Sequence, residues 1–234
     1  MSDNFINISF FFPAFITRHF LYLKLKEKAE KFAKGKLIDL GCGTKPYEKL
    51  FDFFIDSYYG VDYPITADVN YKNQTKADLF VDCTNTGLDS KSFDTLLSTQ
   101  VMEHIADTDL YLKECYRLLK KGGNGIFTVP FIWECHSEPF DYYRFTKYGL
   151  EYLFSKHDFK IISIEESEGA FAALIQTKII SIYNRNIKNI FFKYYLIMLN
   201  LIRIPVYNLI AMLFDNLFSN KKLCLNYIII VEKN

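Results

Sequence analysis

The sequence lacks a strong net charge and a pattern of paired cysteines. Its 28 lysines and arginines stand against 27 acidic residues, which leaves a formal charge of +1. This argues against phosphate-driven nucleic-acid binding, because such binding needs a strong basic surface. The five cysteines are odd in number and form no C-x-x-C, so neither a disulfide framework nor a zinc site is indicated. We therefore expect a cytoplasmic protein without a nucleic-acid partner.

Long uninterrupted apolar runs are also missing. Residues 4–20 are apolar but have no basic segment before them and no small-residue cleavage site, so a signal peptide is not expected. In residues 176–222 the apolar stretches are far shorter than the roughly 20 residues that cross a bilayer. Arg203 and Pro205 interrupt the middle of this segment, and it is predicted not to cross a membrane. The length of 234 residues suits one main domain.

A buried strand that runs into a glycine turn is predicted at residues 36–44. The apolar residues of this stretch suit a strand, and Gly41 and Gly43 allow the backbone to turn sharply beside a ligand. The G-x-G-x-x-G pattern of phosphate binders is incomplete, because Pro46 occupies the position of its third glycine. A ligand without phosphates is therefore favoured.

Acidic residues stand near the ends of three successive predicted strands. These residues are Asp39, Asp62 and Asp82. Each one alone could be an ordinary cap or turn carboxylate. Their joint spacing favours a ligand that spans the strand ends, because open parallel sheets bind ligands outside the carboxyl ends of their strands.

Short apolar strands alternate with helices from Lys36 onward, which is typical of a parallel sheet with helices on both faces. The predicted helices cover residues 15–33, 110–120 and 147–155. Asp107 or Thr108 is expected to cap the second helix and Gly122-Gly123 to stop it, while Thr146 caps the third. The later strands are predicted at residues 126–129, 159–164 and 225–231.

The order of these motifs, followed by Gln100–Ile105 (Q-V-M-E-H-I), resembles the class I S-adenosylmethionine-dependent methyltransferases over residues 32–165. The resemblance implies an α/β fold with a Rossmann-like, seven-stranded, mostly parallel sheet whose last strand is antiparallel. It also implies S-adenosyl-L-methionine as the cofactor, with Asp62 accepting hydrogen bonds from the ribose hydroxyls and Asp82 facing the adenine amino group. The implied cofactor-binding residues are Asp39, Gly41, Gly43, Asp62, Asp82, Cys83 and Gln100.

A polar loop at residues 133–146 is the candidate substrate segment, because polar loops at strand ends concentrate function. Its H-x-E-P-x-D-Y-Y-R-x-T pattern resembles a subgroup of these enzymes associated with bacterial surface-polysaccharide and lipid-linked glycan pathways. The catalytic candidates are His104, His136, Asp141 and Arg144. Either histidine could accept a proton near neutral pH, since the unperturbed pKa of histidine is about 6.5. Arg144 could instead pair with Asp141 and hold the loop.

A metal is not expected in this site. The sulfonium methyl group of the cofactor is already activated, so transfer mainly needs an aligned nucleophile and a group that removes a proton. Glu138, His136 and Asp141 could supply ligands for a divalent cation. Their types and spacing match no metal signature, so none is predicted.

The last third of the chain departs from the minimal family pattern. We expect an N-terminal helical cap at residues 1–35, a cofactor-binding core at 36–175, a helical insert at 176–222 and a final strand at 223–234. The insert carries seven basic residues and one acidic residue, so its charge is 7 minus 1, or +6. It could lie on an anionic membrane, or it could be a cover or a homodimer contact buried within protein.

Three functional hypotheses follow. The first is methylation of an oxygen or nitrogen of a small molecule, with a sugar or glycan intermediate favoured. The second is methylation of a quinone or lipid precursor by an enzyme that is peripheral at the inner face of the membrane. The third is a methyltransferase-like interaction module without turnover, against which the intact acidic positions argue.

Overall fold

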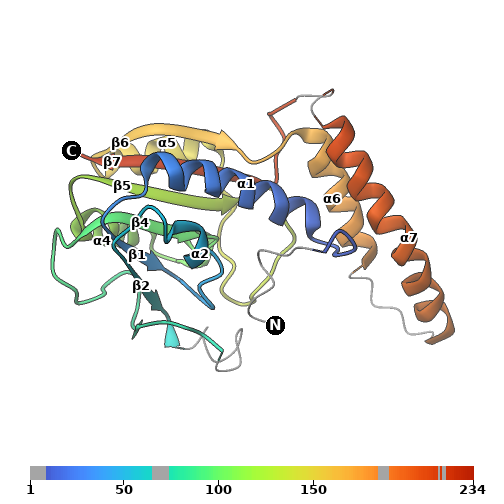
Figure 1. Ribbon diagram of the computed structural model, residues 1–234, viewed down its shortest axis with the longest axis horizontal. Coiled ribbons are helices and arrows are strands. Elements are labelled where there is room, and N and C mark those ends of the chain that lie inside the picture. Colours follow the sequence, from blue (N-terminus) through green and yellow to red (C-terminus); the bar gives the residue numbers. More distant parts are fainter. Residues whose placement is uncertain (1–8, 65–73, 184–189, 216, 218–219) are drawn as a thin grey trace.

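The computed structural model describes residues 9–64, 74–183, 190–215, 217 and 220–234. Its centre is a seven-stranded sheet with the strand order β3-β2-β1-β4-β5-β7-β6 (Figure 1). The strands are β1 (Lys36–Leu40), β2 (Ser57–Asp62), β3 (Leu79–Phe80), β4 (Phe93–Thr99), β5 (Leu119–Pro130), β6 (Phe159–Glu166) and β7 (Asn226–Lys233). Only β7 runs antiparallel to its neighbours, which confirms the predicted fold class.

The order of the strands reverses between β1 and β4. The chain passes outward from β1 to β2 and β3 on one side, and then returns to place β4 against the other side of β1. In open parallel sheets, the crevice at such a reversal is where ligands bind, outside the carboxyl ends of the strands. This reversal therefore selects one edge of the sheet for the site.

Helices cover both faces of the sheet because successive side chains of a strand point to opposite faces. On one face, α1 (Phe15–Phe32) and α2 (Glu48–Phe51) pack with Leu37 and Leu97. On the other face, α4 (Thr108–Leu118) and α5 (Lys147–Lys156) pack with Ile38 and Leu96 (Figure 1). A 3₁₀ turn, η1 (Met102–His104), lies between β4 and α4.

The helix caps on this second face match two predictions. The Asp107 carboxylate accepts a hydrogen bond from the Leu110 N–H at 3.0 Å, and the Thr146 hydroxyl accepts one from the Gly149 N–H at 3.1 Å. The predicted end of the second helix was wrong, because α4 stops at Leu118 and Lys120 already belongs to β5. The Lys233 ammonium donates to the Leu119 carbonyl at 2.8 Å. Leu119 also pairs with Phe93 of β4, so the chain continues as a strand from this residue.

Two further helices, α6 (Ala170–Tyr183) and α7 (Ile190–Phe214), project from one end of the sheet (Figure 1). The predicted boundary at residue 176 was wrong, because α6 begins at Ala170. The Asp215 carboxylate, just beyond α7, accepts hydrogen bonds from the Gly169 and Ala172 N–H groups at 2.8 and 2.9 Å. The unpaired donors at the start of α6 are thereby satisfied.

α7 is one continuous helix, although Pro205 lies inside it. A proline in a helix interior removes one backbone hydrogen bond and costs about 3 kcal/mol. Here the turns around it are held by Ile204, Asn208 and Ala211, which are buried. The expectation that Arg203 and Pro205 break the segment was wrong, and Tyr194–Phe214 has the length and composition of a membrane span, with a mean hydropathy of 1.8.

Candidate active site

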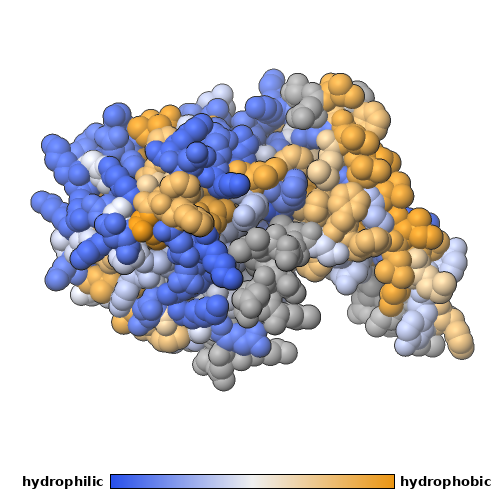
Figure 2. Space-filling model, viewed as in Figure 1, coloured by the Kyte–Doolittle hydropathy of each residue, from blue (hydrophilic) through white to orange (hydrophobic). Residues whose placement is uncertain are grey.

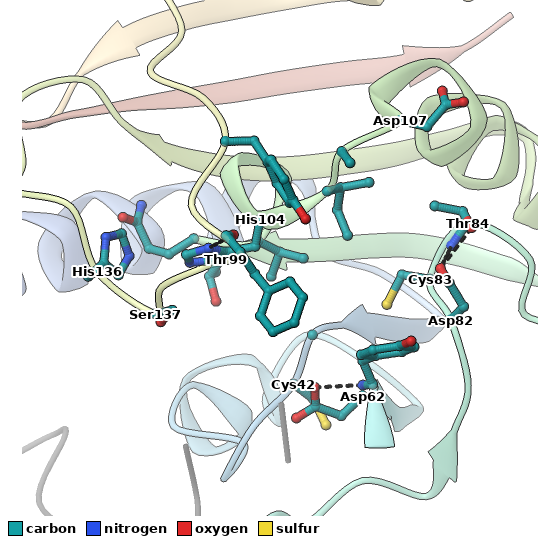
Figure 3. A pocket seen from close by; sticks show the side chains of 18 of the residues that line it. Cys42, Asp62, Asp82, Cys83, Thr84, Thr99, His104, Asp107, His136 and Ser137 are labelled. Atoms are coloured by element: carbon teal, nitrogen blue, oxygen red, sulfur yellow. Dashed lines mark hydrogen bonds between the residues drawn. The ribbon is translucent and has the colours of Figure 1, made fainter. Parts of the chain in front are cut away.

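A cavity of about 600 Å³ opens at the carboxyl ends of β1, β2 and β4 (Figure 3). Most of the predicted site residues line it. These are Gly41, Asp62, Asp82, Cys83, Gln100, His104 and His136. In Figure 3, Asp62, Asp82 and Cys83 lie toward one end, His136 lies toward the other, and His104 lies between them. The strand-order reversal has therefore gathered the motifs that the sequence suggested.

The turn after β1 requires glycine at position 41. Gly41 has a φ of +77°, a region that side chains disfavour. A Cβ atom added there would lie 2.4 Å from a methyl carbon of Val101. The Gly41 N–H donates to the Val61 carbonyl at 2.8 Å, so the turn is fixed against the end of β2.

Asp62 is oriented by backbone donors at the end of β2. Its two carboxylate oxygens accept hydrogen bonds from the Tyr63 N–H at 2.8 Å and from the Gly43 N–H at 3.0 Å. Gly43 does not itself line the cavity, but it holds the carboxylate that does. The Thr75 hydroxyl also donates to Asp62 at 3.5 Å, and a carboxylate has about four acceptor positions in all.

Asp82 follows the short strand β3 and lines the cavity. One of its oxygens accepts hydrogen bonds from the Thr84 N–H at 2.8 Å and the Thr84 hydroxyl at 2.7 Å. Cys83 beside it is buried, and burial raises the pKa of its thiol to about 12. Cys83 therefore contributes a neutral wall rather than a nucleophile.

Asp39 lies beneath the site instead of lining it. Its side chain is 1% exposed, and the Tyr58 hydroxyl donates to it at 2.5 Å. Burial raises the pKa of this carboxyl to about 7. The prediction that three carboxylates share one rim is therefore corrected to two, because a strand alternates its side chains and Asp39 turns toward the layer below.

The His104 ring is held in one tautomer. Its Nδ1 lies 2.8 Å from the Phe140 carbonyl oxygen, which can only accept, so Nδ1 carries the proton and Nε2 keeps its lone pair. Burial lowers the pKa of His104, and the ring is neutral at pH 7. The His136 ring packs edge-on against it, with centroids 4.7 Å apart.

Glu103, which the sequence analysis did not select, is the unusual group in this site. It is fully buried, and neither of its carboxylate oxygens has a hydrogen-bond partner among the described residues. Burial raises the pKa of this carboxyl to about 8, so it is mainly protonated at pH 7. Burial of this kind cannot be recognised in the string V-M-E-H-I alone.

One group of side chains could hold a divalent cation. Ligand atoms of Glu103, His104 and His136 lie within 4.8 Å of one another, and imidazole with carboxylate suits several transition metals. This set differs from the one weighed from the sequence, in which Asp141 was a member. Metal-independent transfer stays a prediction.

Asp141 and Arg144 form a bidentate ion pair outside the cavity lining. The two nitrogen–oxygen distances are both 2.7 Å, and the Arg144 guanidinium holds the pKa of the Asp141 carboxyl well below its usual range. Asp141 also accepts a hydrogen bond from the His136 N–H at 2.9 Å. Of the two alternatives for Arg144, the geometry favours the one that holds the loop, and both residues are removed from the catalytic set.

The loop also supplies lining residues that the sequence did not single out. The Tyr142 N–H donates to the Glu103 carbonyl at 2.9 Å, which docks the loop on η1. The apolar residues Val101, Ile105, Ala106 and Phe140 and the ring of Tyr142 also line the cavity, while Thr99 and Ser137 lie beside the two histidines (Figure 3). A chain with 23 Phe and 17 Tyr gives no signal as to which rings line a cavity.

A smaller cavity of about 200 Å³ adjoins the first one. It lies between the first turns of α1 and Trp133, and it shares Tyr47, Gln100 and His136 with the larger cavity. The N-terminal helix α1 therefore lines the smaller cavity and not the larger cavity at the strand ends. The end of the site near His136 is the one that reaches α1.

Residues 38–127 match the family described as a methyltransferase domain. Over these 90 of its 234 residues the chain carries a methyltransferase domain. Its fold is similar to that of an S-adenosylmethionine-dependent methyltransferase from Archaeoglobus fulgidus, with 16% identity, a TM-score of 0.57, and 92% of this chain and 94% of that chain covered. It is also similar to phosphoethanolamine N-methyltransferase 2 of Haemonchus contortus in complex with S-adenosyl-L-methionine, with 17% identity, a TM-score of 0.53, and 100% and 60% covered.

A curated relative matches over a shorter stretch. It is a ubiquinone biosynthesis O-methyltransferase of Pelagibacter ubique, 28% identical over 135 residues, which are 56% of this chain and 54% of that protein. The chain thus spans about half the length of the curated relatives it matches.

The cofactor of this domain is S-adenosylmethionine, and the residues present fit it. The cavity volume of about 600 Å³ lies in the range of ordinary ligand pockets. Asp62 offers two fixed carboxylate oxygens to a diol, and the glycine turn leaves its backbone open to the ligand. Asp82 lies on the same side of the cavity as Asp62 (Figure 3).

Asp62→Ala should weaken binding of S-adenosylhomocysteine about 100-fold. Hydrogen bonds to a charged group contribute about 1.5–3 kcal/mol each, and about 1.4 kcal/mol is a tenfold change. Isothermal titration calorimetry measures the change. Asp56→Ala is the matched control, since Asp56 is an exposed carboxylate before the opposite end of β2. Unchanged affinity in Asp62→Ala would refute the ribose role.

Glu103→Gln should make the protein's stability less dependent on pH. The folded-state pKa of about 8 exceeds the ordinary value of 4.5, so the folded chain keeps a proton that the unfolded chain loses. The contribution of Glu103 therefore falls as pH rises from about 4.5 to 8. Urea unfolding should show the variant gaining at least about 1 kcal/mol on the wild type between pH 5 and pH 8, since one pKa unit is worth about 1.4 kcal/mol. An equal difference at both pH values would contradict this.

Proposed function

We propose that this chain methylates a hydroxyl oxygen of an apolar, ring-containing acceptor of the quinone-precursor class, with S-adenosylmethionine as the methyl donor. The observation that carries the proposal is the His104 imidazole. It is neutral, fixed in one tautomer by the Phe140 carbonyl, and exposed to the end of the cavity away from Asp82. A base in that position suits an acceptor that must lose a proton.

The character of the acceptor is inferred from the walls around this base. Apolar surface exceeds polar surface in the cavity lining, with Ile105 and Phe140 among its residues, and the polar side chains beside the histidines include Thr99 and Ser137 (Figure 3). A sugar has several hydroxyls, and each one buried without a partner costs free energy. A ring with one or two hydroxyls leaves fewer groups unsatisfied. The name of the Pelagibacter relative, an O-methyltransferase of ubiquinone biosynthesis, supports the same class, whereas the sugar acceptor favoured by the loop pattern has no support from the relatives.

One end of the cavity would bind the cofactor and the other end the acceptor. When bound, the cofactor supplies a methyl group that is already electrophilic. Asp62 and Asp82 would hold its adenosyl part at one end. His104 orients the acceptor hydroxyl and takes its proton at Nε2. The docked loop, through the Tyr142 N–H bond to Glu103, keeps water from this end.

A neutral His104 gives the reaction a defined pH dependence. Because burial lowers its pKa from the ordinary 6.5, the base stays deprotonated at neutral pH and is lost only in more acidic solution. The rate should therefore be flat around neutral pH and fall only in solution more acidic than the ordinary histidine pKa of 6.5.

His104→Ala should lower kcat about 10²–10⁴-fold, the usual worth of a positioned general base, with little change in the affinity for S-adenosylhomocysteine. The assay follows transfer of a radiolabelled methyl group to a catechol with an apolar side chain. The acid limb of the pH profile should disappear in this variant.

His136→Ala is the matched comparison, because His136 packs against His104 but lies at the cavity end. It should raise KM for the acceptor more than it lowers kcat. Normal turnover in His104→Ala would contradict the assignment of the base. A higher kcat/KM for a free sugar than for the catechol would contradict the acceptor class, and absence of transfer to any acceptor despite cofactor binding would favour a module without turnover.

A further inference from the structure

The α6–α7 hairpin carries an apolar surface that the methyl-transfer site does not use. The two helices project from the sheet domain (Figure 1), and Figure 2 shows that their exposed surface is almost continuously hydrophobic. α7 has 25 residues, which corresponds to about 37 Å at 1.5 Å per residue. Apolar patches of this extent are rare on monomeric soluble proteins and mark interaction sites.

One face of α7 packs against the rest of the protein. Four residues of this face are buried, namely Ile204, Asn208, Ala211 and Asp215. Their spacing of three and four residues places them on one side of the helix. The Asn208 amide donates to the Phe10 carbonyl at 2.7 Å. Together with the hydrogen bonds from the start of α6 to Asp215, these buried residues hold α7 against the sheet domain.

The opposite face of α7 has no protein against it in the described part of the chain. Phe191 is 84% exposed and Ile202 is 68% exposed. The exposed apolar residues that share this face follow helical spacing and include no charged residue. They are Phe191, Tyr194, Met198, Ile202, Val206, Leu209 and Leu213. This set is referred to below as the α7 stripe.

Charge and composition together indicate a lipid surface as the occupant. The sequence from residue 176 to 222 carries seven basic residues and one acidic residue, and anionic lipid attracts basic segments by about 1 kcal/mol per residue near the surface. A second copy of the chain would bring another +6 segment against this one. Tyr194 lies on the stripe, and tyrosine is enriched at the membrane–water interface.

The packing decides how the helix meets the bilayer. Tyr194–Phe214 has the length and composition of a span. A spanning helix would be surrounded by lipid, which would break the Asn208 and Asp215 hydrogen bonds and expose those groups to hydrocarbon. A helix that lies along the interface keeps these bonds and buries only its apolar side.

We propose that the α7 stripe docks on the surface of an anionic phospholipid bilayer, with α7 lying in the plane of the interface. The cluster that packs α7 on the domain also includes Trp133, which walls the smaller cavity beside His136. Docking would therefore hold the acceptor end of the site close to the membrane.

Vesicle flotation tests this proposal with the full chain. The probes are vesicles of phosphatidylcholine alone and of phosphatidylcholine mixed with phosphatidylglycerol. The wild type should float with the mixed vesicles and bind at least tenfold more weakly to phosphatidylcholine alone. The double substitution Ile202→Glu with Leu209→Glu, which places two charges in the α7 stripe, should reduce binding to the mixed vesicles at least tenfold.

The matched control is Phe53→Glu with Tyr148→Glu, which adds the same charges at exposed apolar side chains away from α7. It should float as the wild type does. Calorimetry with S-adenosylhomocysteine should give the same affinity for all three proteins, which checks folding separately from docking and separately from turnover. Failure of the wild type to float with mixed vesicles would overturn the proposal, as would equal flotation of the α7 double variant. A wild-type dimer that the α7 double variant makes monomeric would instead assign the stripe to a second copy.

Discussion

The reversal of strand order between β1 and β4 is the constraint on which the rest of the site depends. Because β2 and β4 flank β1 in parallel, three strand ends meet at one edge of the sheet. The glycine turn, Asp62 and η1 each follow one of those ends. A different order would leave the same residues in the chain but distribute them over separate edges.

The two ends of this crevice differ in chemistry because their side chains differ in burial and in hydrogen-bond partners. The Asp62 carboxylate is fixed by two backbone N–H groups at the end where polar hydroxyls of a cofactor are to be held. At the other end the Glu103 carboxyl is buried, has no hydrogen-bond partner among the described residues and is mostly neutral at pH 7; the His104 Nε2 lies 3.8 Å from one of its oxygens. His104 beside it is neutral for the same reason, which is desolvation. The Asp141–Arg144 pair keeps the loop closed over this end without entering it.

The sequence was informative where a local pattern determines the structure. Asp107 and Thr146 cap their helices as predicted, since a cap depends on a few adjacent residues. The failures came from burial and long-range contacts. Asp39 was placed at the rim because it precedes the glycine turn, but it lies within β1 and its side chain is buried against the Tyr58 hydroxyl. Pro205 predicted a break, although packing of Ile204 and Ala211 maintains the helix. Glu103 was overlooked because nothing in the sequence shows that a carboxyl lacks partners.

A crystal structure with S-adenosylhomocysteine bound would test the central claim most directly. The account predicts that the ribose diol lies within hydrogen-bond distance of the Asp62 carboxylate and that the sulfur points toward His104 rather than toward Asp82. A ligand whose ribose contacts Asp39, or whose sulfur lies at the Asp82 end of the cavity, would contradict it.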